Sequence, residues 1–197
     1  LVLLEGKRTL VLVPDAALHH LSFDALLTAP ATPGALNYRN LAYLSNRFQT
    51  HYAPSATLLG KMQAHRSTGS GYLGVAPEYD IDALASNPQM GAYRGFGDHA
   101  TALEGAKAEV AAVSTLMKGK TLVGLAATEG SFKRLVSNHG VLHLAMHAVT
   151  GDQSPLDSKL IFSQTPDSAE DNFLNVYEIY SLQLNAELAV LSACNTG

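Results

Sequence analysis

The sequence of 197 residues has a single cysteine and few charged residues. One cysteine rules out internal disulfides and a cysteine-rich zinc site, and it fits a reducing cytoplasm. Charged residues make up 15% of the chain, against roughly 25% in an average globular protein. Because the hydrophobic fraction of 47% is ordinary, the shortage lies in surface charge, and we expect part of the surface to be covered by something else.

Long charged runs and long apolar runs are also missing. The net charge is -4 and no run of Lys and Arg exceeds two residues, so nucleic acids and anionic membranes are poor candidates for partners. The apolar stretches are far shorter than a bilayer span. Residues 1–4 lack the basic start and the cleavage site of a signal peptide. We therefore expect a cytoplasmic protein without a membrane partner.

The length suits one well-cored α/β domain over residues 1–197. Short apolar runs rich in β-branched residues alternate with helical patterns, which is typical of parallel βαβ units. Residues 77–100, rich in Gly, Pro, Asn and Asp, are predicted to be a surface loop. After it, Thr101 and Glu104 form a capping box that predicts a helix to Met117. Strands are predicted over residues 9–13, 48–52, 71–76, 121–125, 141–146, 159–162 and 188–193, and further helices over 54–65, 128–138 and 176–182.

Two of the predicted strands end in reactive side chains. The apolar run 141–146 leads into His147, and the run 188–193 leads into Cys194. Ligands of open α/β sheets bind beyond the carboxyl ends of the strands, so the two side chains would emerge together if these strands are neighbours. A cysteine after an apolar run is, however, usually a small buried hydrophobe. The residues alone leave both interpretations open.

The sequence segments around these residues are more specific than the two residues alone. The segments 143–148 (HLAMHA) and 191–197 (LSACNTG) strongly resemble the two signature blocks of the CHAT family, which are caspase-like peptidases related to separases and often attached to tetratricopeptide repeats. Further segments resemble family landmarks in the family's order: 12–15 (LVPD), 21–26 (LSFDAL), 52–56 (YAPSA), 127–129 (ATE), 158–162 (SKLIF) and 174–182.

The resemblance implies a caspase-like three-layer α-β-α sandwich with a mostly parallel central sheet. It also implies a cysteine endopeptidase without a cofactor, which hydrolyses peptide bonds in protein substrates through a His147/Cys194 dyad. The backbone N–H groups of Ala148 and Cys194 would form the oxyanion hole. His143, four residues back inside the strand, is expected to be a buried structural histidine bonded to a neighbouring loop.

Ala148 departs from the family, which usually has Gly after the catalytic histidine. If the position needs a positive φ, Ala would carry strain there; if not, its N–H is still presented. This departure supports an alternative function, an inactive caspase-like scaffold or binding module. A third class, an unrelated α/β hydrolase or transferase, lacks the Gly-x-Ser-x-Gly elbow and the Gly-rich phosphate loop that it would need.

Three residues after His147 are candidates for substrate binding: Asp152, Asp157 and Ser158. An ordinary solvated loop explains them as well. No metal motif is found. The expected partners are a protein substrate, a TPR-type or other regulatory module in the same or a partner chain, and the remaining C-terminal segment of the peptidase domain. That segment is expected because the strand 188–193 would otherwise be an exposed apolar edge, and we take the chain to be a piece of a longer protein.

Overall fold

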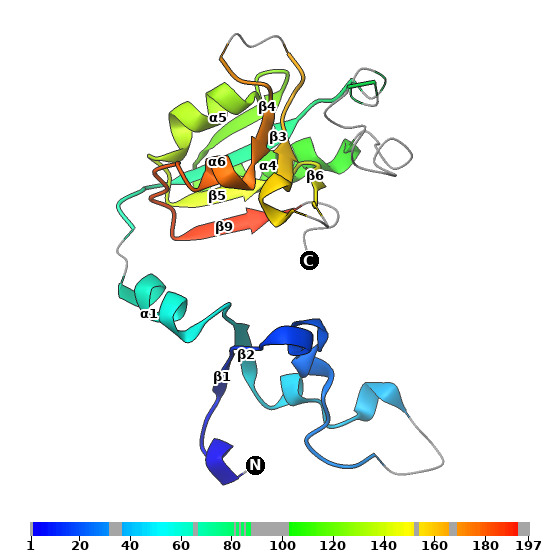
Figure 1. The fold of residues 1–197 in the computed structure, drawn as a ribbon. Helices are drawn as coiled ribbons and strands as arrows, with labels where there is room; N and C mark the ends of the chain where they lie inside the picture. The colour runs from blue at the N-terminus through cyan, green and yellow to red at the C-terminus, as the bar shows by residue number, and fades with distance from the viewer. Residues whose placement is uncertain are drawn as a thin grey trace. The chain divides into compact units, whose positions relative to one another are not determined.

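A computed structural model describes residues 2–31, 37–64, 67–80, 103–151, 154–165 and 169–192, together with 82, 84, 86 and 87. The chain forms two compact units, Leu1–Arg66 and Ser67–Gly197 (Figure 1). The interpretation of the whole chain as one domain stays a prediction. Most of the loop predicted over residues 77–100 lies outside the described residues.

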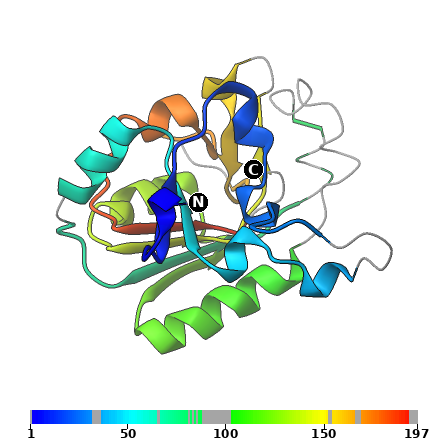
Figure 2. The same cartoon turned by 90° about the horizontal axis from the view of Figure 1, so that it is seen from below.

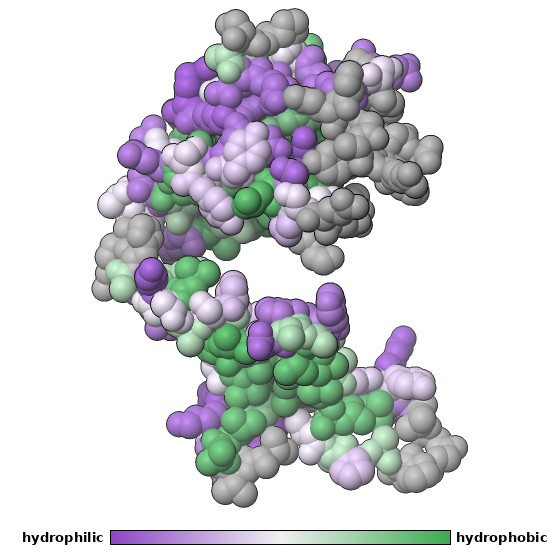
Figure 3. Space-filling view, viewed as in Figure 1, coloured by the Kyte–Doolittle hydropathy of each residue, from purple (hydrophilic) through white to green (hydrophobic). Residues whose placement is uncertain are grey.

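The first unit contains one pair of parallel strands, β1 (Thr9–Leu12) and β2 (Gln49–Tyr52). Both were predicted, and so was helix α1 (Ala56–Ala64). Among the described residues of this unit the buried apolar ones are Leu44, Phe48 and Ala53. Apolar side chains cover much of its visible surface (Figure 3). Its 3-10 helices are η1 (Val2–Leu4), η2 (Ala16–His20), η3 (Phe23–Ala25), η4 (Tyr38–Asn40) and η5 (Leu44–Asn46).

The second unit is built on a four-stranded sheet in the order β4-β3-β5-β9, with all strands parallel. The strands are β3 (Tyr72–Pro77), β4 (Lys120–Gly124), β5 (Val141–Leu144) and β9 (Leu188–Leu191). All six residues of β3 are buried, which explains why its sequence is continuously apolar rather than alternating. The predicted α/β fold with a parallel sheet is confirmed.

Helices cover both faces of this sheet and make it the middle of three layers (Figure 2). On one face lies α4 (Glu104–Met117), whose Ala106 and Val110 pack against Ala76 and Ala145. On the other face lie α5 (Glu129–Val136) and α6 (Val176–Ile179). The layer order agrees with the prediction.

A second, antiparallel sheet of three short strands lies beside the first, in the order β6-β7-β8. Its strands are β6 (Ala148–Val149), β7 (Lys159–Ile161) and β8 (Phe173–Asn175), and η6 (Pro155–Asp157) precedes β7. The sequence predicted β7 but missed β6 and β8, because strands of two or three residues show no measurable alternation.

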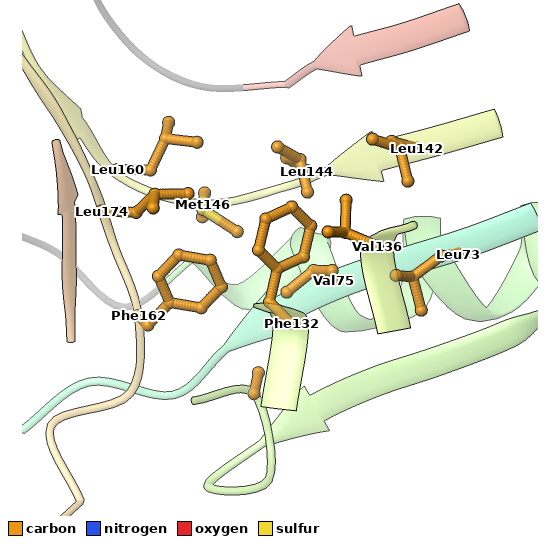
Figure 4. Close-up of a cluster of buried hydrophobic side chains, with 11 residues drawn as sticks. Leu73, Val75, Phe132, Val136, Leu142, Leu144, Met146, Leu160, Phe162 and Leu174 are labelled. Carbon is orange, nitrogen blue, oxygen red and sulfur yellow. The ribbon is translucent and has the colours of Figure 1, made fainter. Parts of the chain in front are cut away.

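The main core of the second unit joins both sheets and helix α5 (Figure 4). The rings of Phe132 in α5 and Phe162 after β7 pack with their centroids 5.4 Å apart. Met146, between β5 and β6, is fully buried in the same cluster. The buried members of the cluster are Leu73, Val75, Ala127, Phe132, Val136, Leu142, Leu144, Met146, Leu160, Phe162 and Leu174.

The helix starts bear on the predicted capping box and show two further caps. Helix α4 begins at Glu104 after Leu103, which makes no side-chain cap; Thr101 of the predicted capping box lies outside the described residues. Thr128 does cap α5, because its Oγ1 accepts a hydrogen bond from the Ser131 N–H at 3.2 Å. A capping box missed by the sequence analysis starts α6, where Asn175 and Glu178 satisfy each other's backbone N–H groups.

Candidate functional site

The two strands that lead toward His147 and Cys194 are direct neighbours. β5 pairs with β9 in parallel, from Val141 opposite Leu188 to Leu144 opposite Leu191. One further backbone bond continues the pairing, because the Ser192 N–H donates to the Leu144 carbonyl at 2.9 Å. The condition on which the predicted site depends is therefore met. Cys194 itself lies outside the described residues.

His147 follows β5 and is buried, with 5% of its surface exposed. Its ring lies against the ring of Tyr79, with 4.8 Å between the centroids. The Tyr79 hydroxyl accepts a hydrogen bond from the His147 N–H at 3.0 Å and donates to the Ile161 carbonyl at 2.9 Å. Burial raises the pKa of Tyr79, so this hydroxyl keeps the proton that it donates.

Tyr79 was missed in the sequence because it falls in the stretch that was predicted to be a surface loop. It follows the end of β3 by two residues. β3 lies next to β5 in the middle of the sheet. Functional groups of open α/β sheets gather beyond the carboxyl ends of the strands, so the position of Tyr79 just after β3 could have indicated its part in the site.

The orientation of the Ala148 backbone decides whether its N–H can donate a hydrogen bond away from the neighbouring strand. Ile161 donates its N–H to the His147 carbonyl, so the next pair, Ala148 opposite Leu160, is a pair without mutual hydrogen bonds. The Ala148 N–H therefore points away from β7. The described non-glycine residues with positive φ are Ala16, Lys118 and Asn172, and Ala148 is not among them. Alanine thus carries no left-handed strain where the family usually has glycine.

The three candidates for substrate binding lie in different situations. Asp152 is outside the described residues. Asp157 ends the 3-10 helix η6. The Ser158 hydroxyl accepts a hydrogen bond from the Gly151 N–H at 2.9 Å, which closes the loop after β6. Their role in substrate binding stays a prediction.

An apolar cavity of about 430 Å³ adjoins Ala148 and Ser158. Its walls come from β5 and β9, through Leu142, Leu144 and Leu191, and from Ile179 of α6. These side chains share one face of the sheet, which is the face that α5 and α6 cover. The cavity therefore lies on the side of the sheet opposite α4.

His143 is buried in the middle of β5, as predicted. Its partners are not in a loop, however. Its Nδ1 lies 2.8 Å from the Tyr72 hydroxyl in β3, and its Nε2 lies 3.0 Å from Oε1 of Glu109 in α4. The expected bond to a neighbouring loop is wrong, because β3 and α4 flank this point of β5 more closely than any described loop.

Comparison with known families decides the relationship. The family model of the CHAT domain matches residues 3–197. The chain belongs to the CHAT domain family. The resemblance found in the sequence is thereby confirmed, and with it membership of a caspase-like peptidase family. A search of curated proteins finds no match to the chain.

No described helix of this CHAT domain has both the length and the apolar character that crossing a bilayer requires.

One group of carboxylates in the CHAT domain has the spacing of metal ligands, but a lysine already occupies it. Glu129, Glu170 and Glu178 bring their oxygens within 4.8 Å of one another. The Lys133 ammonium lies 2.7 Å from Glu129, 2.7 Å from Glu170 and 3.0 Å from Glu178. The ion pairs outweigh burial and raise the pKa of Lys133. The cluster ties α5 to α6 and to the chain before β8.

Glu129 is the member of this cluster whose ionised form is disfavoured in the folded chain. Its carboxylate is fully buried, and burial raises its pKa to about 7 even though Lys133 acts against the shift. The folded chain therefore holds a proton that the unfolded chain releases near the ordinary value of 4.5. The resulting contribution to stability is complete below about pH 4.5 and is lost as the pH rises toward 7.

We expect Glu129→Gln to remove this loss, since a glutamine resembles the protonated carboxyl. The free energy of unfolding of the parent should fall relative to the variant by on the order of 2–3 kcal/mol between pH 4.5 and 7. Urea unfolding at a series of pH values measures the difference. Glu5→Gln, at an exposed glutamate of the first unit, is the control. Parallel curves for the parent and Glu129→Gln would contradict the assignment.

Proposed function

We propose that the chain is a cysteine endopeptidase that hydrolyses peptide bonds in protein substrates through His147 and Cys194. The register of β5 and β9 carries the proposal. Leu144 pairs with Leu191, and His147 and Cys194 each follow these partners by three residues. Paired residues of parallel strands point to the same face. If the register continues, the imidazole and the thiol share one face at one edge of the sheet.

The chemistry follows from these groups. The thiolate is the attacking species, and a cysteine with the ordinary pKa is only a few per cent ionised near neutral pH. An imidazole beside the thiol favours the thiolate–imidazolium pair, and His147 then protonates the leaving amine. The N–H of Ala148, which points away from β7, and that of Cys194 would bind the oxyanion of the tetrahedral intermediate. No cofactor is needed.

The alternative of an inactive scaffold rested on Ala148. The absence of a positive φ at this residue removes the reason for expecting a distorted oxyanion hole. The endopeptidase is therefore the function that the residues support better. Asp157 and Ser158, and Asp152 with them, remain proposed contributors to the substrate cleft.

The proposed partners follow from exposed apolar surface. Leu188 and Leu191 of β9 are 51% and 47% exposed, although an edge strand of a sheet is normally short, charged or covered. We propose that the remaining C-terminal segment of the peptidase domain covers this edge. A TPR-type or other regulatory module, in the same or a partner chain, and a cytoplasmic location complete the proposal.

The experiment uses the fact that Cys194 is the only cysteine of the chain. The rate of alkylation by iodoacetamide, measured from pH 5 to pH 9, reports the ionisation of this one thiol. We expect the midpoint of this pH profile to lie at a lower pH than that of a free cysteine, whose pKa is about 8.5. His147→Ala should move the profile up to the free-cysteine value, because the stabilising imidazolium is lost.

His51→Ala, at an exposed histidine of the first unit, is the matched control and should leave the profile unchanged. A parent protein whose thiol reacts with the profile of free cysteine, or does not react, would count against the endopeptidase and in favour of the binding module.

A further inference from the structure

A tyrosine hydroxyl is inserted into the antiparallel ladder at His147. Ala148 lies opposite Leu160, so His147 lies opposite Ile161 one step along the ladder. Residues of such a pair exchange two backbone hydrogen bonds, and the Ile161 N–H does donate to the His147 carbonyl at 3.0 Å. The return bond runs through the Tyr79 hydroxyl, which accepts from the His147 N–H at 3.0 Å and donates to the Ile161 carbonyl at 2.9 Å.

The inserted hydroxyl acts as a spacer between the two chain segments. Two hydrogen bonds that meet at one oxygen hold the His147 nitrogen and the Ile161 oxygen roughly 5 Å apart, whereas a direct backbone bond would bring them to about 2.9 Å. Tyr79 therefore keeps the nitrogen of His147 about 2 Å further from β7 than a regular ladder would. Because the carbonyl of His147 keeps its direct bond, the spacer tilts this residue away from β7 at its nitrogen.

The same tyrosine also restrains the side chain of His147. The two rings lie with their centroids 4.8 Å apart and their planes at 45°. His147 is buried, and a closely packed ring cannot turn without displacing its neighbours. One residue thus restrains both the backbone and the imidazole of His147.

Tyr79 is itself held by its surroundings. The preceding residue, Glu78, donates its N–H to Oγ of Ser163 at 3.0 Å, and Ser163 is fully buried. Tyr79 also packs against a cluster of buried apolar residues, Leu84, Val149, Ile161 and Phe173. A hydroxyl on so fixed a base can keep a constant separation between the two segments.

We propose that Tyr79 is a positioning residue for His147, because its hydroxyl spaces the histidine backbone from β7 and its ring sets the plane of the imidazole. The inference rests on the proposed function, in which His147 protonates the leaving amine. A displacement of about 1 Å in such a site is enough to cost up to about 100-fold in rate. Tyr79 acts on the reaction through His147.

The first test measures the spacer on His147 itself and does not require activity. In Tyr79→Phe the ring remains and the hydroxyl is lost, so the His147 N–H should bond directly to the Ile161 carbonyl. NMR measures the scalar coupling across that bond, between the His147 nitrogen and the Ile161 carbonyl carbon. We expect no such coupling in the parent and a measurable one in the variant. A coupling already present in the parent, or absent from both proteins, contradicts the spacer.

The second test measures the consequence for the reaction. The substrate is a synthetic peptide that spans a bond cleaved by the full chain in a peptide library from a denatured proteome. We expect Tyr79→Phe to lower kcat at least about tenfold with KM unchanged, and Tyr79→Leu, which also removes the ring, to lower kcat further. Tyr180→Phe removes a hydroxyl from a tyrosine that is 77% exposed and should leave both constants unchanged.

The outcomes separate positioning from structure and from the proposed function. A purely structural role would lower the melting temperature and leave kcat at the parent value, so all assays are run below the melting temperature of the least stable variant. A parent that cleaves peptides while Tyr79→Phe matches its kcat overturns the positioning role and leaves the endopeptidase standing. A parent that cleaves no peptide of the library overturns the endopeptidase, and the positioning role with it.

Discussion

Replacing Cys194 by alanine should lower peptide hydrolysis by at least about 1,000-fold, because it removes the attacking atom and leaves only the oxyanion donors and the binding surface. A peptide library prepared from a denatured proteome serves as the substrate, since the preferred sequence is unknown. Mass spectrometry then counts the new termini produced by the parent and by the variant. His147→Ala should cause a loss of similar size, because the two side chains act as a unit.

The double variant sharpens this prediction. If Cys194 and His147 form a dyad, removing both costs no more than removing one. Far-UV circular dichroism of each variant should match the parent, which separates loss of chemistry from loss of fold. Cleavage by Cys194→Ala at the rate of the parent would exclude the cysteine peptidase mechanism outright.

Replacing Phe162 by alanine should cause the largest loss of stability. Its side chain is fully buried and packs against Phe132 between the two sheets of the second unit. A Phe→Ala change in such a place costs about 3–5 kcal/mol, from the lost transfer of the ring out of water and from the cavity left behind. Urea unfolding followed by circular dichroism measures the difference in the free energy of unfolding.

The matched control for Phe162 is Leu116→Ala in α4. Leu116 is 82% exposed, so its truncation should change stability by no more than about 0.5 kcal/mol. A cost below about 1 kcal/mol for Phe162→Ala would mean that the core relaxes around the missing ring, and it would contradict the tight packing described for this cluster.

Strands with continuous apolar runs were predictable from the sequence. β5 and β9 lie within runs that were predicted as strands. β3 overlaps its predicted run 71–76 and ends one residue later, at Pro77. The three strands are neighbours in the order β3-β5-β9, which supports the hypothesis that the site lies beyond the strand ends. Burial on both faces leaves an unbroken apolar signal, which does not depend on long-range contacts. The predicted end of β5 at Met146 was two residues too long, because an apolar side chain also fits a buried turn.

The polar contacts of the site were not predictable in the same way. Glu109 looks like an ordinary solvent-facing residue of an amphipathic helix, and only the packing of α4 on the sheet brings it to His143 and Ser192. Glu129 has the type and place of a helix-start carboxylate, yet it is fully buried. Such contacts join residues far apart in sequence, and a single sequence carries no local signal for them.

The place of β3 in the sheet has a consequence for how the protein is made. Tyr72 pairs with Val141 on one side, and Leu73 pairs with Lys120 on the other. A ribosome that synthesises this chain therefore releases β3, whose six residues are all buried in the folded unit, well before either neighbour exists. Until those residues emerge, both edges of β3 lack a neighbouring strand. Chaperones bind nascent segments of this kind, and such segments aggregate when no chaperone binds them. The sheet can therefore assemble only after its later strands have been synthesised, and β9, the last of the four to be made, joins last.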